Sequence, residues 1–442
     1  MVPDEALYKK IALRLIPFMM VLYLIAFLDR VNISFAALTM NADLGFSPTV
    51  FGWGAGIFFL GYFVFEVPSN LILERVGARL WIFRIMVTWG LISAAMAFVQ
   101  GPVSFFVLRF LLGVAEAGFL PGMILYLTTW FPQARLARFV GLFMMAVPLA
   151  SAIGAPISSL ILSAHGFLGF AGWQWLFIIE GLPACALGFA VLALLPDGPA
   201  TAKWLTEEER AIVAARLAED RANHGHRVRA ALGPTMIDGR VWLLCLTYFG
   251  IVVGLYGVGL WLPQLIRGLG FSIAQVGVLT ALPYLASAAA MLVWGRHSDR
   301  KGERIWHVGM PTLLAAAGLV AAIAVPSGWP ELAALGIATV GIYATLGPFW
   351  GLPPIFLTST AAAGGIALIN SVGNLGGFLG PSIVGWTLEL TNSFHAGLSV
   401  IAVCLERFTA ELNRRGFPNR RGFDSRCWLG WRPASDGPTS FQ

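Results

Sequence analysis

The sequence is poor in charged residues and in cysteine. Only 12% of its 442 residues are Asp, Glu, Lys or Arg, about half the share of a typical soluble domain. Its four cysteines show no CxxC spacing, so the sequence indicates neither a disulfide framework nor a metal site. It also contains no phosphate-binding loop or nucleophile motif, and we therefore expect no enzymatic activity and no bound metal.

Hydrophobic residues, in contrast, make up 57% of the chain, and the mean hydropathy is +0.76. Such a composition predicts an all-α polytopic membrane protein, because about 20 apolar residues cross a bilayer as a helix. Runs of that length predict two sets of six helices, the twelfth of which is doubtful. The predicted spans are residues 15–38, 50–73, 81–99, 103–126, 138–162, 174–195, 241–266, 276–296, 307–325, 331–355 and 364–388.

The net charge of +6 does not indicate a nucleic-acid partner, because the basic residues are scattered in short clusters between apolar runs. Lys and Arg gather in alternate connections, including Lys9, Lys10 and Arg14 before the first span, whereas the opposite connections offer only Arg267. By the positive-inside rule the N-terminus and the central linker are cytoplasmic. The first run is too long for a cleaved signal peptide and predicts an uncleaved span.

Four segments are expected. Residues 1–196 form the first bundle, 197–240 a cytoplasmic linker, 241–402 the second bundle, and 403–442 an aberrant polar tail. In the linker, Thr206 and Glu209 form a capping box ahead of an amphipathic helix. The tail is either the product of a shifted reading frame or an unusual cytoplasmic extension. A single-base change near codon 403 that restored about 20 apolar residues would support the first hypothesis.

A charged residue inside an apolar run is costly and indicates function, and four such residues stand out. They are Asp29 and Arg30 in the first span and Arg109 and Glu116 in the fourth. Neighbours in sequence differ by about 100° around a helix, so Asp29 and Arg30 need partners on other helices. We predict that Arg30 pairs with Glu116. The alternative is that these residues only hold helices together, but buried ion pairs seldom improve on apolar packing.

The charges of these four residues suggest a mechanism. When all four are ionised they sum to zero, and when Asp29 and Glu116 are protonated they sum to +2. Burial favours the neutral form of a carboxyl, so proton uptake would free the arginines to bind a carboxylate. We therefore predict that Asp29 and Glu116 couple protons and that Arg30 and Arg109 bind an anion.

Two cytoplasmic turns repeat one pattern at matching places in the two sets of six. ERVGAR at Glu74 to Arg79 follows the second span, and DRKGER at Asp299 to Arg304 follows the eighth. This repetition favours internal duplication. The residues expected to gate the turns are Glu74, Arg75, Gly77, Arg79, Asp299, Arg300, Gly302 and Arg304.

With these turns the chain resembles the major facilitator superfamily, since GRHSDRKGER matches its GxxxDRxGxR loop motif. The first copy departs from the motif, with Asn70 for the leading glycine and Glu74 for the aspartate. LDRVNIS, EVPSN, RFLLGVAEAGFLPG and INSVGNLGGFLGP further resemble the anion:cation symporter family. That resemblance implies two pseudo-symmetric six-helix bundles and uptake of organic anions such as sugar acids, tartrate or phthalate, usually with protons. It also implies that Asp29, Arg30, Arg109 and Glu116 are the proton-coupling and anion-binding groups.

Weaker candidates for substrate contact are Tyr62, Asn370, Trp350 and Tyr256. Glu180 lies in the sixth span without an identifiable partner. The expected molecule is a monomeric symporter in the lipid bilayer of a bacterial inner membrane. It takes a small organic anion and needs no cofactor, with protons as the coupling ion. A facilitator or exchanger on the same fold, and an anion sensor that does not transport, are the alternatives.

Overall fold

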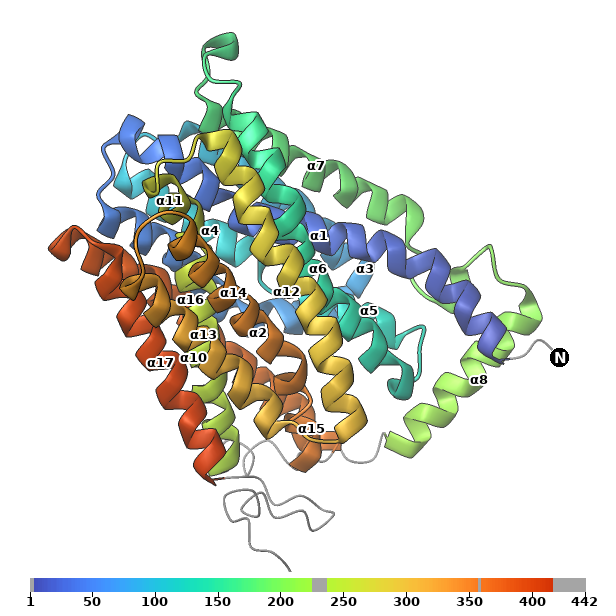
Figure 1. The fold of residues 1–442 in the computed structure, drawn as a ribbon. Helices are drawn as coiled ribbons and strands as arrows, with labels where there is room; N and C mark the ends of the chain where they lie inside the picture. The colour runs from blue at the N-terminus through green and yellow to red at the C-terminus, as the bar shows by residue number, and fades with distance from the viewer. Residues whose placement is uncertain (1–3, 225–236, 357–358, 416–442) are drawn as a thin grey trace, which may run out of the picture.

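The computed structural model describes residues 4–224, 237–356 and 359–415, and the described part is almost entirely helical (Figure 1). The first set of helices is α1 (Asp4–Leu44), α2 (Pro48–Val76), α3 (Ala78–Ala95), α4 (Pro102–Glu116), α5 (Phe119–Thr128), α6 (Gln133–Leu162) and α7 (Gly172–Leu194). Then come α8 (Glu207–His224), α10 (Gly239–Gly259), α11 (Leu262–Gly268), α12 (Ile273–Lys301), α13 (Ile305–Ala324), α14 (Trp329–Trp350), α15 (Pro353–Phe356), α16 (Ser359–Thr391) and α17 (Phe394–Arg415). Three short 3-10 turns are Met96–Phe98, Phe167–Gly169 and Pro199–Thr201.

Within the described residues, eleven helical segments are long and apolar enough to cross a membrane. The predicted spans are found in order. Three of them are interrupted where glycine or proline ends a helix: between α4 and α5, between α10 and α11, and between α14 and α15. The fold is therefore the predicted all-α polytopic membrane architecture.

The helices form two halves with matching neighbours. In the first half α3 packs on α7, α2 on α4 and α1 on α6, and in the second half α13 packs on α17, α12 on α14 and α10 on α16. Between the halves α2 packs on α16 and, equivalently, α6 packs on α12. This correspondence confirms the two pseudo-symmetric bundles.

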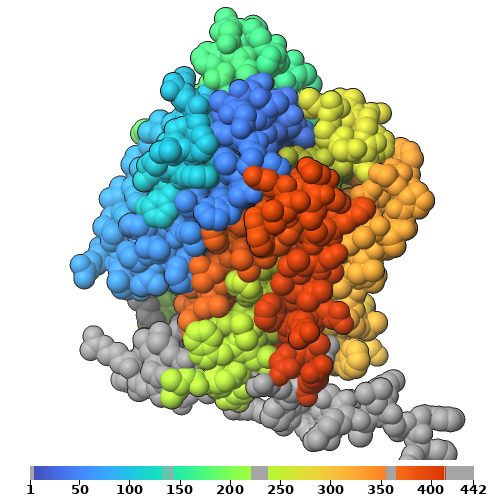
Figure 2. All heavy atoms as spheres, turned by 90° about the vertical axis from the view of Figure 1, so that its left-hand side faces the viewer, coloured from blue at the N-terminus to red at the C-terminus, as the bar shows by residue number. Residues whose placement is uncertain are grey.

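The twelfth position is filled by α17, which lies where α7 lies in the first half. Figure 2 shows α17 in red along the outer face of the second half. Its buried residues are Leu398, Ile401, Ala402, Leu405, Thr409 and Leu412, a stripe with helical spacing that packs on α10 and α13. The helix therefore continues through the predicted boundary at 402 to Arg415, although α17 is not among the eleven apolar spans. Residues 416–442 of the predicted tail lie outside the described residues.

The linker helix α8 is docked on the first half. Lys10 donates to Glu209 at 2.8 Å, and Arg216 pairs with Asp4 at 2.8 Å. The predicted capping box is present, because the N–H of Glu209 donates to the Thr206 hydroxyl at 3.2 Å and Glu209 accepts from the N–H of Thr206 at 2.9 Å. Residues 225–236 of the linker lie outside the described residues.

At one end of the molecule the halves touch along their backbones. A Cβ added to Gly52 of α2 would meet the carbonyl oxygen of Pro381 of α16 at 2.5 Å, and one added to Gly56 would meet that of Phe378 at 2.7 Å. A Cβ on Gly385 would likewise collide with the carbonyl oxygen of Pro48. Only glycine permits so close an approach, and this end of the molecule is closed.

Candidate functional site

Arg30 and Glu116 form a buried ion pair between α1 and α4. Arg30 Nη2 donates to Glu116 Oε1, the pairing that the sequence predicts. The Glu116 side chain is 1% exposed and that of Arg30 is 16% exposed. Glu116 Oε2 and Arg30 Nε are buried and have no hydrogen-bond partner among the described residues. The pair thus keeps one donor and one acceptor unused.

Glu116 owes its position to a break in the fourth span. It is the last residue of α4, and the chain turns at Ala117 (ψ 130°) and Gly118 (φ +86°) before α5 begins. The turn leaves the carbonyl of Ala117 without an intrahelical partner, and the hydroxyl of Ser69 on α2 donates to it at 2.6 Å. A side chain at Gly118 would collide with that hydroxyl. The predicted span 103–126 therefore consists of two helices, α4 and α5, because the left-handed glycine ends the first of them.

Arg109 is fully buried, with 1% of its surface exposed. Its Nε donates to the carbonyl of Gly54 at 3.1 Å and its Nη2 to that of Ala55 at 3.0 Å, so the backbone of α2 holds the guanidinium in place. Nη1 has no partner in the described part of the chain. A buried cation with a free donor is suited to bind an anion.

Aromatic rings surround Arg30. Its guanidinium carbon lies 5.4 Å from the ring centres of Phe58 and Tyr62 and 5.5 Å from that of Phe27. Tyr62, a predicted substrate contact, thus meets Arg30 through its ring. Tyr256, from the second half, accepts a hydrogen bond from Arg30 Nη1 at 3.2 Å. The structure therefore brings Tyr62 and Tyr256 to the same guanidinium.

Asp29 points away from this pair into the first half. Its carboxylate accepts from Trp89 Nε1 and Ser93 Oγ, both on α3, and from Asn32 Nδ2 at 2.7 Å. The prediction of a polar partner on another helix is correct, and Asp29 and Arg30 are on different sides of α1, as their adjacency requires.

Asn370 and Trp350, the remaining predicted contacts, belong to the second half. Asn370 Nδ2 donates to Glu66 of α2 at 2.8 Å, and Ser371 Oγ donates to the same carboxylate at 3.1 Å. Asn370 thus bridges the halves through Glu66, which is 5% exposed. Trp350 packs edge-on against Tyr248 at 4.9 Å between ring centres.

Ser371 and Tyr248 were missed by sequence reasoning. Ser371 directly follows Asn370, and Tyr248 precedes Tyr256 by about two turns of α10, which is the only signal available for either. A serine or tyrosine in an apolar span carries no charge to single it out, so its importance depends on which way its helix faces.

The two turns that repeat one sequence pattern differ in their contacts. In the second turn Arg304 donates to Asp299 at 2.6 Å and to the hydroxyl of Ser298 at 2.7 Å, and Gly302 is left-handed with φ +65°. In the first turn Arg79 donates to Asp197 at 2.9 Å and to the carbonyl of Leu192.

The other predicted gating residues do not join these contacts. Gly77, with φ +93°, separates α2 from α3. Glu74, Arg75 and Arg300 are exposed and form no ion pair in the described part of the chain. The turns are therefore equivalent in position, but Arg79 holds the start of α3 to the end of α7 whereas Arg304 closes its own turn.

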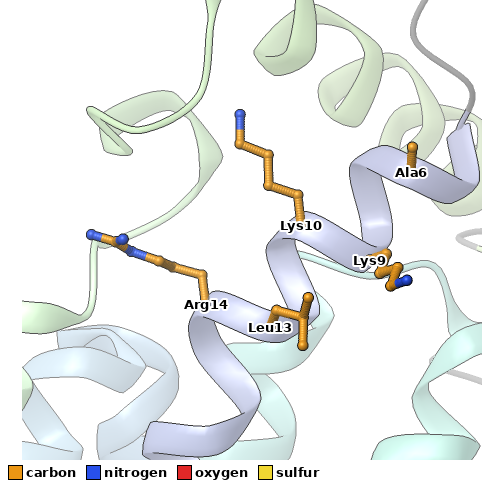
Figure 3. Close-up of a pocket in the computed structure, with 5 residues that line it drawn as sticks. All are labelled: Ala6, Lys9, Lys10, Leu13 and Arg14. Atoms are coloured by element: carbon orange, nitrogen blue, oxygen red, sulfur yellow. The ribbon is translucent and has the colours of Figure 1, made fainter.

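A separate cavity of about 460 Å³ opens beside the first turns of α1 and is lined by Ala6, Lys9, Lys10, Leu13 and Arg14. In Figure 3, Lys10 and Arg14 extend from one side of the helix and Lys9 and Leu13 from the other. Arg14 is 16 residues before Arg30, about 24 Å along the helix. This cavity is therefore distinct from the buried charges. Across the described ranges no group of His, Cys, Asp and Glu could hold a metal ion.

Comparison with known proteins agrees with this architecture. The sequence model described as "Major Facilitator Superfamily" matches residues 19–381. A protein of Agrobacterium vitis named "Putative tartrate transporter" is 56% identical over 402 residues, which cover 90% of this chain and 89% of that protein. The Escherichia coli protein named "Inner membrane transport protein RhmT" is 39% identical over 420 residues, covering 93% and 96%.

A solved structure shares the fold. A bacterial homologue of the human lysosomal transporter Spinster, in an inward-facing and occupied conformation, superposes with a TM-score of 0.73 at 17% identity, covering 97% of this chain and 99% of that one. Two six-helix halves around buried charges define a multi-pass membrane transporter of small molecules, not an enzyme. The chain belongs to the Major Facilitator Superfamily, as its loop motif and paired charges predict.

Proposed function

We propose that the chain is a proton-coupled symporter that imports an organic anion, such as tartrate or another dicarboxylate or sugar acid, by alternating access across a bacterial inner membrane. The observation that carries this proposal is the buried Arg30–Glu116 ion pair, next to Arg109 with its free donor. The names of the tartrate-transporter relative and the inner-membrane relative support the substrate class and the location.

Competition for Arg30 couples the proton to the anion. While Glu116 is ionised it holds the guanidinium and leaves the two arginines and Asp29 close to neutral overall. A proton on Glu116 removes that hold, and Arg30 then turns its donors to a substrate carboxylate. The planar guanidinium binds a carboxylate through two parallel hydrogen bonds. Proton and anion therefore bind together, as symport requires.

Arg109 supplies the second anchor. Its guanidinium carbon lies 5.1 Å from the ring centre of Phe58, and that of Arg30 lies 5.4 Å from the same ring. The two cations flank one aromatic residue, an arrangement that suits an anion with two separated acidic groups. Asp29, tied to α3, tunes the charge of the first half without contacting the substrate.

The closed backbone contact between α2 and α16 supports an inward-facing state. It lies at the N-terminal end of α2, whereas α8 and the N-terminal turns of α1 lie at the other end of the molecule (Figure 1). Because Lys and Arg concentrate near α8 and the start of α1, that other end is cytoplasmic by the positive-inside rule. During the transport cycle the α2–α16 contact would open and the cytoplasmic end would close.

The first experiment measures thermal stability of the purified protein with mono- and dicarboxylates at acidic and neutral pH. An anion at a hundred times its dissociation constant stabilises by about 2.7 kcal/mol. We expect stabilisation by one anion class, stronger at acidic pH and lost in Arg109→Gln. No stabilisation of a cooperatively melting protein by any anion would reject the anion site.

The second experiment separates symport from exchange on the same fold. In proteoliposomes Glu116→Gln, which keeps the shape of the side chain but cannot bind or release a proton, should abolish uptake driven by a proton gradient and preserve exchange of internal for external anion. If Glu116→Gln still accumulates anion against its gradient as the unaltered protein does, proton coupling at Glu116 is wrong. Ligand binding without any flux would favour a sensor.

A further inference from the structure

A second carboxyl lies near Asp29 in the first half. Glu180 of α7 is 5% exposed and Asp29 is 1% exposed, so both are removed from water. Glu180 Oε1 accepts from the hydroxyl of Ser158 of α6 at 2.7 Å, and its Oε2 is buried with no partner among the described residues. A buried carboxylate oxygen without a donor is costly if the group is charged.

Asn32 is close to both carboxyls. Its amide donates to Asp29 Oδ1 at 2.7 Å, and its side chain also neighbours Glu180. Asn32 is itself buried, at 1% exposed. One amide thus lies near acidic groups that belong to α1 and α7, which pack directly on each other.

No charged group around this pair forms a salt bridge with it in the described part of the chain. Arg30 follows Asp29 on α1 but pairs with Glu116, and Arg109 is held by α2. Ser93 and Trp89 face the pair from α3, Glu116 and Arg109 from α4, Ser158 from α6 and Cys185 from α7. No lysine or arginine donates to Asp29 or Glu180 within residues 4–224, 237–356 and 359–415.

Two ionised carboxylates to which no cation donates a hydrogen bond would repel each other in a medium of low dielectric. Binding a proton removes that cost and turns one carboxyl oxygen into a donor. We propose that Asp29, Asn32 and Glu180 form a proton-binding site enclosed by α1, α3, α6 and α7, in which Glu180 is a second proton-binding group. Its part in transport rests on the symport proposed above, whereas its occupancy by a proton does not.

The site is placed to respond to the movement of the halves. Ser158, the donor to Glu180, is followed by Ser159, and a Cβ added to Gly277 of α12 would press on Ser159 and on the carbonyl of Ala155. When α6 and α12 separate, α6 is released from the second half and the Ser158–Glu180 hydrogen bond is free to change. Proton binding at Glu180 would thereby differ between the two states of the cycle.

Infrared spectroscopy of the purified full-length protein tests proton occupancy directly, because a protonated carboxylic acid has a C=O stretch that a carboxylate lacks. We expect this band in the unaltered protein at near-neutral pH, its loss on titration to alkaline pH, and a smaller band in Glu180→Gln. Glu331→Gln is the matched control. Glu331 is a buried glutamate of α14 that accepts from a serine, Ser327, at 2.9 Å, and its replacement should leave the pH-dependent band unchanged.

Uptake gives a second measurement. In Glu180→Gln the ratio of uptake at acidic to neutral pH should fall by about tenfold, the factor by which one pH unit changes the ratio of proton-bound to proton-free site. Glu331→Gln should keep the ratio of the unaltered protein. A changed infrared band with pH-independent uptake in every variant would uphold the site and reject the proposed symport.

Two outcomes would overturn the site itself. One is a band equal in Glu180→Gln and the unaltered protein, which would leave Glu180 a structural residue. The other is loss of the band when sodium chloride replaces choline chloride at constant pH, which would make sodium the bound cation.

Discussion

Arg30 Nη1 donates a hydrogen bond to the hydroxyl of Tyr256 at 3.2 Å, and this contact joins the first half of the molecule to the second at the buried ion pair. Arg30 therefore has two partners, Glu116 from its own half and Tyr256 from the other. In the proposed symport, an anion that engages Arg30 would rearrange both contacts. Substrate binding and the relative position of the halves would thus be linked through one guanidinium.

Tyr256→Phe tests this link. The hydroxyl that accepts from Arg30 keeps its own proton, which can be donated to a carboxylate bound at Arg30. Loss of one such hydrogen bond costs about 1 kcal/mol, or roughly a fivefold weaker anion affinity. Anion affinity is measured by thermal stabilisation or calorimetry. Tyr284→Phe is the control, because Tyr284 packs on Tyr343 in the second half, and an equal loss in both variants would show a general packing effect.

Asn370→Ala should lower the stability of this conformation, because a buried carboxylate oxygen of Glu66 would lose its hydrogen-bond donor. The cost of an unsatisfied buried group is about 1–3 kcal/mol, seen as a lower thermal midpoint. Ser371→Ala removes the longer bond to the same carboxylate and should cost less. Because the two donors bind the two oxygens of one carboxylate, the loss in the double variant should not equal the sum of the losses in the single ones. Strict additivity would contradict the shared contact.

Gly52→Ala should impair closure of the α2–α16 contact. The new Cβ would meet the carbonyl oxygen of Pro381 at 2.5 Å, where backbone cannot easily yield. Overpacking of this kind costs about 1–3 kcal/mol, enough to shift a two-state equilibrium about 5- to 150-fold. Faster hydrogen–deuterium exchange in residues 48–60 and reduced uptake would report the shift.

Gly336→Ala is the control for that experiment. Gly336 lies within α14, and a Cβ there meets only the ring of Pro283 at 3.8 Å, an ordinary contact. Uptake should be preserved and the helix slightly stabilised. Equal behaviour of the two glycine variants would show that the closed contact does not limit transport.

The docking of α8 should depend on pH through Glu209. Hydrogen bonds from Lys10 and from the backbone of Thr206 hold the pKa of Glu209 below its ordinary value of 4.5. When docking lowers the pKa of a carboxyl, the ionised carboxylate stabilises the docked state at every pH above its ordinary pKa. That stabilisation is lost as the pH falls through the lowered pKa. Spin labels on α8 and α1 should therefore separate only below pH 4.5, and Glu209→Gln should remove the pH dependence.

Charge and periodicity explain what the sequence could predict. Arg30 and Glu116 were identifiable because an ion in an apolar run needs a partner, and the halves were identifiable because their turns repeat. The break at Gly118 and the role of Ser371 were not, since both depend on which sides of two helices meet. The helix through 403–415 was also missed. Its arginines lower the mean hydropathy, but Leu405, Thr409 and Leu412 keep the spacing of a packed face.

Glu180 is another residue whose surroundings could not be predicted from the sequence. A glutamate in an apolar span signals function, but its neighbour Asn32 lies almost 150 positions earlier, and no local pattern connects the two residues. Only the packing of α1 on α7 brings them together.

The glycines where α2 meets α16 allow the closed end of the molecule to open and close repeatedly. At these positions backbone lies against backbone, so the side-chain contacts broken when the helices part are those of neighbouring residues, such as Ser47 with Glu389 and Trp53 with Phe378. Glycine has no rotamers, so closure restricts no side-chain motion at Gly52, Gly56 or Gly385. Each parting uncovers carbonyl groups that water readily solvates. The open and shut forms can therefore stay close in free energy, and a few kilocalories from ligand and proton are enough to choose between them.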